Sequence, residues 1–258
     1  MYEEQGSLKH SIGYRMEYLL TLPETIDDPY LHVFLHGYSR IESQSPPVFY
    51  RRKWAESLNA PCLFLSDPVH RFSRKSACGW FLLGYDEIKH EVISLRNAIV
   101  KRLGIEGTVW HGPSSGGYAA VRLCMESGTG DLAFTVAPHN DPTNVPQWDE
   151  EISHISQASQ LSAPIPLVNL AEKWSEVPDR LLYCLISEKD AHFAHKHLKP
   201  LLHGYNEFEN VRAVVLRNGL GHGFISDADY SAQLESARQE WGCHRARTGT
   251  AIAGGDSL

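Results

Sequence analysis

Short apolar runs alternate with longer segments of helical periodicity along most of the chain. Runs rich in Val, Ile, Leu, Phe and Tyr, bounded by turn-forming residues, predict strands at residues 12–22, 31–35, 62–65, 108–111, 133–137, 181–186 and 211–216. Apolar residues three or four positions apart predict helices at residues 48–58, 86–103, 117–127, 190–202 and 227–241. Strands that alternate with helices are typical of α/β proteins, so we expect a mostly parallel central sheet flanked by helices.

One long interruption separates two of these strands. Residues 140–178 are rich in Pro and Ser and lie between the strands at 133–137 and 181–186. A long insertion of this kind commonly forms a lid or a pocket wall, although a plain surface excursion fits the sequence equally well. We see no internal repeat or linker elsewhere, so residues 1–243 are expected to form one domain. The small and polar residues of 244–258 predict a disordered tail.

The composition narrows the classes of protein to consider. With 42% hydrophobic and 21% charged residues among 258, the chain resembles an ordinary soluble globular protein. The formal net charge is −7 and the longest basic run is Arg51-Arg52-Lys53, which argues against nucleic-acid binding. No segment approaches the roughly 20 apolar residues that a membrane span requires.

The first residues and the cysteines predict a cytoplasmic location. Met1-Tyr2-Glu3-Glu4 has neither the basic residues nor the apolar run of a signal peptide. The five cysteines include no Cys-x-x-Cys pair and lie mostly in apolar segments, as reduced core thiols do. The sequence leaves the oligomeric state open.

The strand at 108–111 runs directly into a Gly-x-Ser-x-Gly motif, which is followed by a helix rich in small residues. Gly112, Ser114 and Gly116 form this motif. A serine on so sharp a strand-to-helix turn has a strained backbone, and glycines on either side remove side chains that would collide. The turn lifts the serine hydroxyl to the edge of the sheet, where the helix N-terminus favours a developing negative charge. This context predicts a nucleophilic serine at position 114.

Two alternatives to this interpretation exist. With Ser115 as the nucleophile, Pro113 and Gly117 would occupy the two close-contact positions, and proline is a poor substitute for glycine there. Without catalysis, the segment would be a plain Gly/Ser turn or a phosphate-binding loop. A phosphate-binding loop would require a lysine after the glycines, where Tyr118 stands.

A serine nucleophile needs a general base, and His222 is the candidate. Among 14 histidines it is the one that lies between the strand at 211–216 and the helix at 227–241. Glycines flank it on both sides, so its loop is able to bring the imidazole over the serine. The other interpretation is a histidine that only stabilises a glycine-rich turn.

The base in turn needs an orienting acid, for which Asp190 is the first candidate. Asp190 lies in the polar turn that follows the strand at 181–186, where its carboxylate would reach the carboxyl edge of the sheet. Glu188 in the same turn is an alternative. Asp141, after the strand at 133–137, is a second alternative. Each of the three could also be a solvated loop carboxylate.

Two backbone N–H groups are expected to form an oxyanion hole beside the serine. Ser115 supplies one of them from the turn itself. The other is expected from Tyr38, because the strand at 31–35 ends in His-Gly and Gly37 gives the next peptide the freedom to turn.

These motifs together resemble the α/β-hydrolase superfamily. The family's pattern is matched in order, over most of residues 12–241, by His36-Gly37, Gly112-x-Ser114-x-Gly116, Asp190 and His222. The resemblance implies a serine esterase, in which Ser114 attacks a carbonyl, His222 carries the proton and Asp190 holds the imidazole. Water would then release the acyl group. The resemblance implies no metal and no organic cofactor.

The sequence gives weaker indications of metals and substrate. His192, His195 and His197 follow one another on a predicted helix without nearby Cys or acidic ligands, so we expect no metal site there. Residues near the carboxyl ends of the strands should line the pocket, and the candidates for substrate binding are Arg40, Trp80 and His139. Arg40 could hold a carboxylate or phosphate, or pair with a nearby acid.

This mixture of aromatic and polar side chains favours a small polar or glycosyl ester over a long-chain lipid, so the expected partner is a small-molecule acyl substrate. Two other functions stay open. An acyltransferase, cyclase or lyase could use the same scaffold with water excluded, and a non-catalytic accessory protein could keep the fold.

Overall fold

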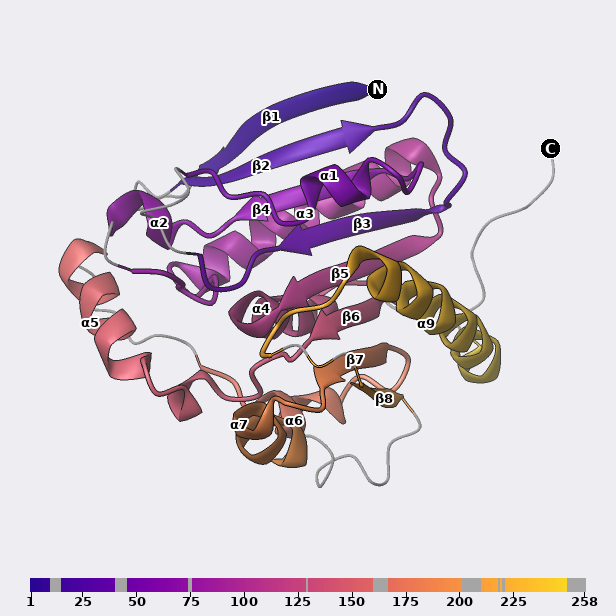
Figure 1. The fold of residues 1–258 in the computed structure, drawn as a ribbon. Coiled ribbons are helices and arrows are strands. Elements are labelled where there is room, and N and C mark those ends of the chain that lie inside the picture. The colour runs from indigo at the N-terminus through magenta and orange to yellow at the C-terminus, as the bar shows by residue number, and fades with distance from the viewer. Residues whose placement is uncertain are drawn as a thin grey trace.

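A single sheet organises the fold of this computed structural model, which describes residues 1–9, 15–39, 46–73, 76–128, 130–159, 167–200, 210–217, 219 and 221–249. Within these residues eight strands pair in the order β1-β2-β4-β3-β5-β6-β7-β8 (Figure 1). The strands are β1 (Tyr2–Lys9), β2 (Arg15–Leu22), β3 (Tyr30–Leu35), β4 (Cys62–Ser66), β5 (Gly107–Pro113), β6 (Leu132–Val136), β7 (Leu181–Ser187) and β8 (Val211–Leu216). Strand β2 runs antiparallel to β1 and β4, whereas β3 to β8 are parallel. The expected α/β architecture with a mostly parallel sheet is therefore confirmed.

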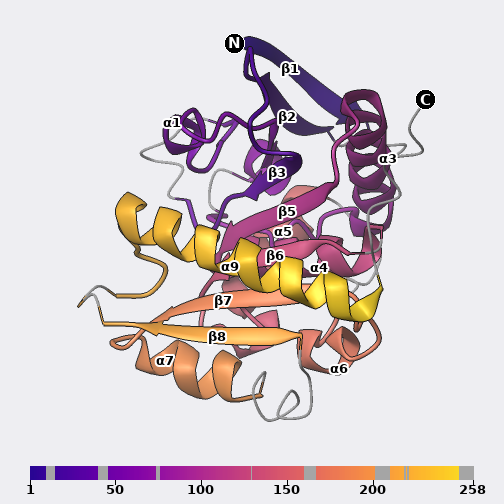
Figure 2. The same ribbon diagram turned by 90° about the vertical axis from the view of Figure 1, so that its right-hand side faces the viewer.

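Helices connect the strands and lie on both faces of the sheet. Those with described bounds are α1 (Arg52–Ala55), α2 (Val69–Phe72), α3 (Tyr85–Leu103), α4 (Ser114–Glu126), α5 (Trp148–Ser159), α6 (Leu170–Trp174), α7 (Ala191–Phe193) and α9 (Asp227–Thr248). A 3-10 turn, η1 (Pro142–Asn144), precedes α5, and a π-helical turn, η2 (Ala194–Leu198), follows α7. Figure 2 shows α9 lying across the strands on one face.

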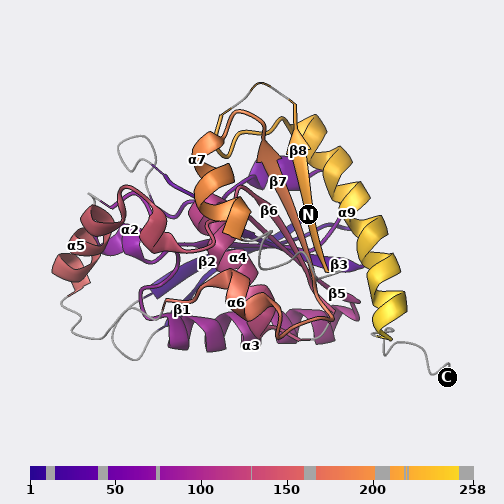
Figure 3. The same ribbon diagram turned by 90° about the horizontal axis from the view of Figure 1, so that it is seen from below.

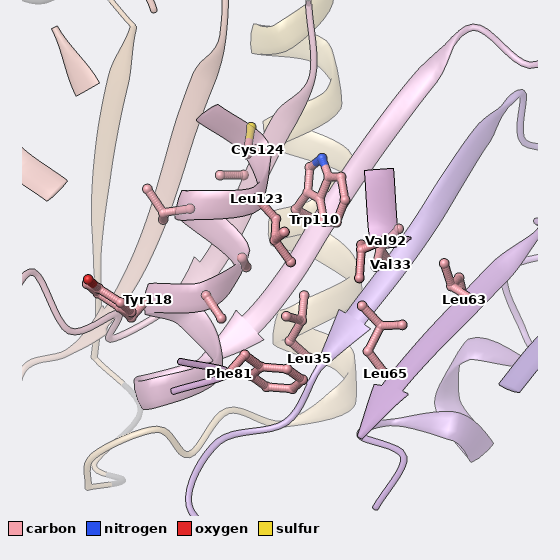
Figure 4. Packing of buried hydrophobic residues seen from close by; sticks show 14 of the residues in the cluster. Val33, Leu35, Leu63, Leu65, Phe81, Val92, Trp110, Tyr118, Leu123 and Cys124 are labelled. Carbon is pink, nitrogen blue, oxygen red and sulfur yellow. The ribbon is translucent and has the colours of Figure 1, made fainter. Parts of the chain in front are cut away.

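Alternate residues of each strand face opposite layers, as a strand's period of two requires. On β5, Val109 packs with α1 and α9, whereas Trp110 packs with α3 and α4. Both side chains are fully buried. Figure 3 shows α3 and α9 on opposite sides of the strands, and Figure 4 shows the cluster around Trp110, with Val33 and Leu35 of β3 beside it. Burial on both faces explains why the central strands are continuous apolar runs.

The strand predictions were accurate for the sheet interior and incomplete at one edge. Strand β8 has the predicted bounds, and β3, β4, β5, β6 and β7 differ from theirs by one or two residues at the ends. Strand β1 was missed because its sequence is polar and its residues are largely exposed, as an edge strand that pairs with one neighbour allows. The first residues of the strand predicted at 12–22 lie outside the described residues.

One helix prediction was too long, and another differs from the structure in helix type. The helix expected at 48–58 is only the four-residue α1, which follows Arg51 in the left-handed conformation with φ 54°. The helix expected at 190–202 is helical over residues 191–200, as α7, the π-helical η2 and two further helical residues, and residues 201–202 lie outside the described part.

The first residues of the predicted tail at 244–258 are helical. Helix α9 runs to Thr248, and residues 250–258 lie outside the described part. Two side chains hold this last turn in place. His244 Nε2 donates a hydrogen bond to the carbonyl of Pro178 over 2.9 Å, and the Arg245 guanidinium lies 5.2 Å from the Trp241 ring centroid. These tertiary contacts override a local composition typical of disorder.

The insertion at 140–178 contains η1, α5 and α6, with residues 160–166 outside the described part. Figure 1 shows α5 beside α2, beyond the end of the strands. Ile155 of α5 packs there against Val69 and Leu83. All five cysteines are free thiols. Within the described residues, the helices are either too short or too polar to cross a membrane.

Candidate active site

The turn from β5 into α4 has the strained geometry that its sequence predicts. Ser114 is the first residue of α4 and has a φ of 51°, a conformation uncommon for residues other than glycine. A Cβ atom on Gly112 would lie 2.3 Å from the carbonyl oxygen of Gly116. A Cβ atom on Gly116 would lie 2.4 Å from the carbonyl oxygen of His36. Both glycines are therefore required, and Ser114 rather than Ser115 occupies the strained position.

Ser114, His222 and Asp190 form one chain of hydrogen bonds. The Nε2 atom of His222 lies 2.9 Å from Ser114 Oγ, and its Nδ1 atom contacts Asp190 Oδ2. The other carboxylate oxygen of Asp190 accepts a hydrogen bond from the Phe193 N–H over 3.1 Å. Because a carboxylate only accepts, the His222 proton lies on Nδ1 and leaves Nε2 free to accept the serine proton. This arrangement can activate a hydroxyl group as a nucleophile.

The two alternative acids lie elsewhere. Asp141 accepts hydrogen bonds from the backbone N–H and hydroxyl of Thr143, over 2.9 Å and 2.7 Å, and so caps η1. Glu188 is exposed at the end of β7. Asp190, in contrast, is buried.

A second histidine, His139, also contacts the serine. Its Nε2 atom lies 3.0 Å from Ser114 Oγ, on a side chain that is buried. The indole N–H of Trp80 donates a hydrogen bond to His139 Nδ1 over 2.9 Å. The sequence analysis predicted both residues in the pocket wall. It did not predict that they form a second series of hydrogen bonds, which ends at Ser114 Oγ. No local pattern links positions 80, 114 and 139.

The loop after β3 is held by a neutral histidine. His36 Nε2 accepts a hydrogen bond from the Asp67 backbone N–H over 2.9 Å, so its proton lies on Nδ1 and is donated to the Gly37 carbonyl over 2.8 Å. Burial is the main cause that lowers the pKa of His36 to about 4. Because the N–H and C=O of a trans peptide point in opposite directions, the same contact orients the backbone N–H of Tyr38.

The two expected oxyanion donors come from two neighbouring segments, Tyr38 from the loop after β3 and Ser115 from the start of α4. Ser115 is the second residue of α4, so its backbone N–H has no partner within the helix. A Cβ atom on Gly37 would lie 2.9 Å from the carbonyl oxygen of Pro113, which shows how closely the two loops approach. The side chain of Tyr38 is exposed, and only its backbone is involved in this arrangement.

A cavity of about 1150 Å³ opens beside Ser114. Trp80 and His139 line it, as do the aromatic side chains of Phe49, Tyr50 and Phe224. The sequence did not single out its cationic wall residue, Arg51, which donates a hydrogen bond to the Tyr50 hydroxyl over 2.9 Å and forms an ion pair with Asp227. Arg40, the other predicted substrate-binding residue, lies outside the described residues.

Solved structures resemble this chain along most of its length. The capsule O-acetyltransferase of Neisseria meningitidis serogroup A is 14% identical, with a TM-score of 0.63 over 90% of this chain and 93% of that one. The esterase domain of a Rhodothermus marinus protein is 15% identical, with a TM-score of 0.57 over 95% and 99%. The proline iminopeptidase of Mycobacterium smegmatis is 10% identical, with a TM-score of 0.58 over 95% and 100%.

The chain has the α/β-hydrolase fold. The predicted resemblance is thereby confirmed at the level of the fold. No protein-family model matches the sequence, and the search of curated proteins gave no match.

The α/β-hydrolase fold explains why distant residues meet at this site. The carboxyl ends of parallel strands lie at one edge of the sheet, where ligands of such sheets bind. His36 follows β3, Ser114 follows β5, His139 follows β6, Asp190 follows β7 and His222 follows β8. Asp67, whose backbone N–H contacts His36, follows β4 in the same way, so each of the six parallel strands brings a polar residue to this edge.

The described residues contain no grouping of three His, Cys, Asp or Glu side chains that would suit a metal ion. His197, one of the three helix histidines, is buried and stacks on His139 with ring centroids 4.8 Å apart. Its Nδ1 atom accepts a hydrogen bond from the Asn140 N–H over 3.3 Å. The absence of a metal or an organic cofactor in the reaction stays a prediction.

Proposed function

We propose that this protein is a serine hydrolase that cleaves an ester bond of a small polar or glycosyl substrate. The observation that carries the proposal is the hydrogen-bonded chain from Ser114 Oγ through His222 to the buried Asp190. The strained φ of Ser114 supports it, because such strain is concentrated at functional residues. The mixed aromatic and polar lining of the cavity supports a substrate that is not a long-chain lipid.

The proposed mechanism has two steps. Ser114 Oγ attacks the substrate carbonyl while His222 Nε2 takes its proton, and Asp190 stabilises the resulting imidazolium. The backbone N–H groups of Tyr38 and Ser115 bind the negative oxygen of the tetrahedral intermediate. His222 then protonates the leaving oxygen, which leaves an acyl group on Ser114. Water, deprotonated by His222, then attacks the acyl carbon, the bond from that carbon to Ser114 Oγ breaks, and His222 returns the proton to Oγ.

Acyl transfer to a hydroxyl acceptor is the second candidate function. The cavity of about 1150 Å³ exceeds the usual range for a single small ligand, so it offers room for an acceptor. The similarity in fold to a capsule O-acetyltransferase makes a glycan hydroxyl the first acceptor to test. Incubation with an activated acetyl ester, with and without a sugar acceptor, separates the two functions by the ratio of acetylated sugar to free acetate.

Labelling with a fluorophosphonate probe, followed by peptide mass spectrometry, tests the proposal directly. We expect an adduct on Ser114 in the wild type and in Ser115→Ala, whose contribution is a backbone N–H, and none in Ser114→Ala. An adduct that persists in Ser114→Ala and is lost in Ser115→Ala would assign the nucleophile to Ser115. A folded wild-type protein without an adduct would contradict the hydrolase proposal and favour a non-catalytic accessory protein.

A further inference from the structure

The tautomer of His139 follows from its hydrogen bond with Trp80. An indole N–H can only donate, so His139 Nδ1, 2.9 Å away, must be the acceptor and carries no proton. A neutral imidazole with an unprotonated Nδ1 carries its proton on Nε2. That proton points at Ser114 Oγ, 3.0 Å away. Ser114 Oγ therefore lies between an imidazole that donates, His139, and one that accepts, His222.

The surrounding structure holds His139 in this position. Its backbone N–H donates to the carbonyl oxygen of Ser114 over 3.2 Å, so backbone and side chain are both tied to one residue. Its ring stacks against His197 at 4.8 Å and lies nearly parallel to the His222 ring at 5.9 Å. Trp80 is itself buried and packs edge-on against Trp148, with ring centroids 5.2 Å apart. The donor thus reaches the serine from a rigid support.

We infer that His139 is a second catalytic imidazole, which donates a hydrogen bond to Ser114 Oγ through the reaction and never accepts the serine proton. The inference rests on the proposed function, because it assigns a role around the same nucleophile. Since Nε2 of His139 already carries a proton, the serine hydroxyl can donate only towards His222. The His139 N–H also stabilises the negative charge that grows on Oγ as that proton leaves.

In the reaction with a fluorophosphonate, the two histidines have different roles. The bond from Ser114 Oγ to phosphorus forms, the phosphorus–fluorine bond breaks, and fluoride leaves. The serine proton passes to His222 Nε2, while His139 keeps its own proton. Trp80 contributes as a positioning residue, because it fixes the tautomer of His139 without touching the serine.

Nitrogen-15 NMR of the histidine side chains tests the tautomer without requiring activity. We expect one imidazole with an unprotonated Nδ1 and a protonated Nε2 whose signals disappear in His139→Gln, which assigns them to His139. In Trp80→Phe the same imidazole should show a fraction with the proton on Nδ1. A wild-type His139 with its proton on Nδ1 would overturn the inference, whether or not the protein reacts with the probe.

The labelling rate of Ser114 tests the role. His139→Leu keeps a side chain of similar bulk but removes the donor, so labelling should slow about tenfold, the loss expected for one hydrogen bond. His139→Gln places an amide N–H at the position of Nε2 and should stay within about threefold of the wild type. An equal decrease of the labelling rate in both variants would mean that His139 has a purely structural role. An unchanged rate in both would mean that His139 has no role in labelling, and either result would overturn the inference. A wild type that fails to label contradicts the proposed function, and with it the catalytic role of His139; losses that differ from those expected in a wild type that labels contradict the inference alone.

Discussion

The backbone N–H of Asp67 donates a hydrogen bond to Nε2 of His36 over 2.9 Å, and this contact leaves the single His36 proton on Nδ1. That proton is donated to the carbonyl oxygen of Gly37 over 2.8 Å. A loop on one side of the site therefore holds the peptide expected to form half of the oxyanion hole. The relay works only while His36 is neutral, because a proton on Nε2 would face the N–H of Asp67.

The folded protein should become less stable as the pH is lowered, because His36 is buried in its neutral form. Burial and the neighbouring His70 lower the pKa of His36 from 6.5 to about 4 in the folded protein. Between these values the unfolded chain binds the proton and the folded chain does not, so acid favours unfolding. We expect His36 to contribute a loss of about 3 kcal/mol in the free energy of unfolding as pH falls from 7 to 4. Urea unfolding across this range measures the loss.

A variant isolates this contribution from that of other groups. His36→Asn keeps an amide N–H near the position of Nδ1 but does not titrate. The wild type should be more stable than His36→Asn at pH 7, and this difference should shrink as the pH falls to 4. A difference that stays constant across the range would show that His36 titrates alike in the folded and unfolded states.

Gly112→Ala should prevent the turn from β5 into α4 from forming. The added Cβ would lie 2.3 Å from the carbonyl oxygen of Gly116, in backbone that has no side chain to move aside. Gly242→Ala is the matched control, because nothing lies within 4 Å of its added Cβ and the residue is inside α9. We expect a loss of soluble protein or of several kcal/mol for Gly112→Ala, and a gain of up to about 1 kcal/mol for Gly242→Ala. Comparable thermal unfolding of the two variants would contradict the close contact.

The fold was largely predictable because its signals are local. Buried central strands such as β5 are continuous apolar runs between turn residues, and α3 buries residues at helical spacing, such as Ile88, Val92 and Ile99. The edge strand β1 lacked this signal, since among the described strands it pairs only with β2 and its polar residues are largely exposed. The end of α9, residues 242–248, was also missed, because its stability comes from tertiary contacts. His244 and Arg245 are held there by contacts to Pro178 and Trp241 that composition does not reveal.

The site was predictable where a motif fixes the backbone. Ser114 could be selected over Ser115 because the glycines at 112 and 116 leave one strained position. Asp190 and His222 followed from their places after strands. The direct contact of His139 with the serine was not predictable, since it depends on Trp80, a residue 59 positions away with no sequence signature. Spacing along the chain does not encode such a side-chain pairing.

Asp190→Asn should nearly abolish the reactivity of Ser114. An amide N–H facing His222 Nδ1 would force the imidazole proton onto Nε2, so Ser114 Oγ would face two donors and no acceptor. We expect labelling by a fluorophosphonate to slow by about 10³–10⁴, as in other Ser-His-Asp sites with the wrong tautomer. Asp141→Asn is the control, because Asp141 bonds only within its own turn in the described structure. A normal rate in Asp190→Asn with a loss in Asp141→Asn would move the acid to the end of β6.

The insertion is attached to the body of the protein by a buried carboxylate. Glu151 of α5 accepts hydrogen bonds from the Ser76 hydroxyl over 2.5 Å and from the Ala77 backbone N–H over 3.1 Å. Its side chain is buried, and Val145 and Gln147, just before α5, line the cavity. A lid that opened by lifting α5 would have to break these buried bonds. The arrangement therefore favours a fixed wall over a mobile lid.

Glu151→Ala should loosen this wall. The substitution leaves the Ser76 hydroxyl and the Ala77 N–H buried without their acceptor, at a cost of about 2 kcal/mol. If that cost falls on the attachment of α5, hydrogen exchange of residues 148–159 should accelerate by about 30-fold. Glu150→Ala, an exposed neighbour on the same helix, should leave the exchange rate within about twofold. Equal protection in both variants would mean that Glu151 does not hold α5. Fast hydrogen exchange of the α5 amides already in the wild type would favour a mobile lid. In a fixed wall these amides exchange only when the hydrogen bonds of Glu151 open.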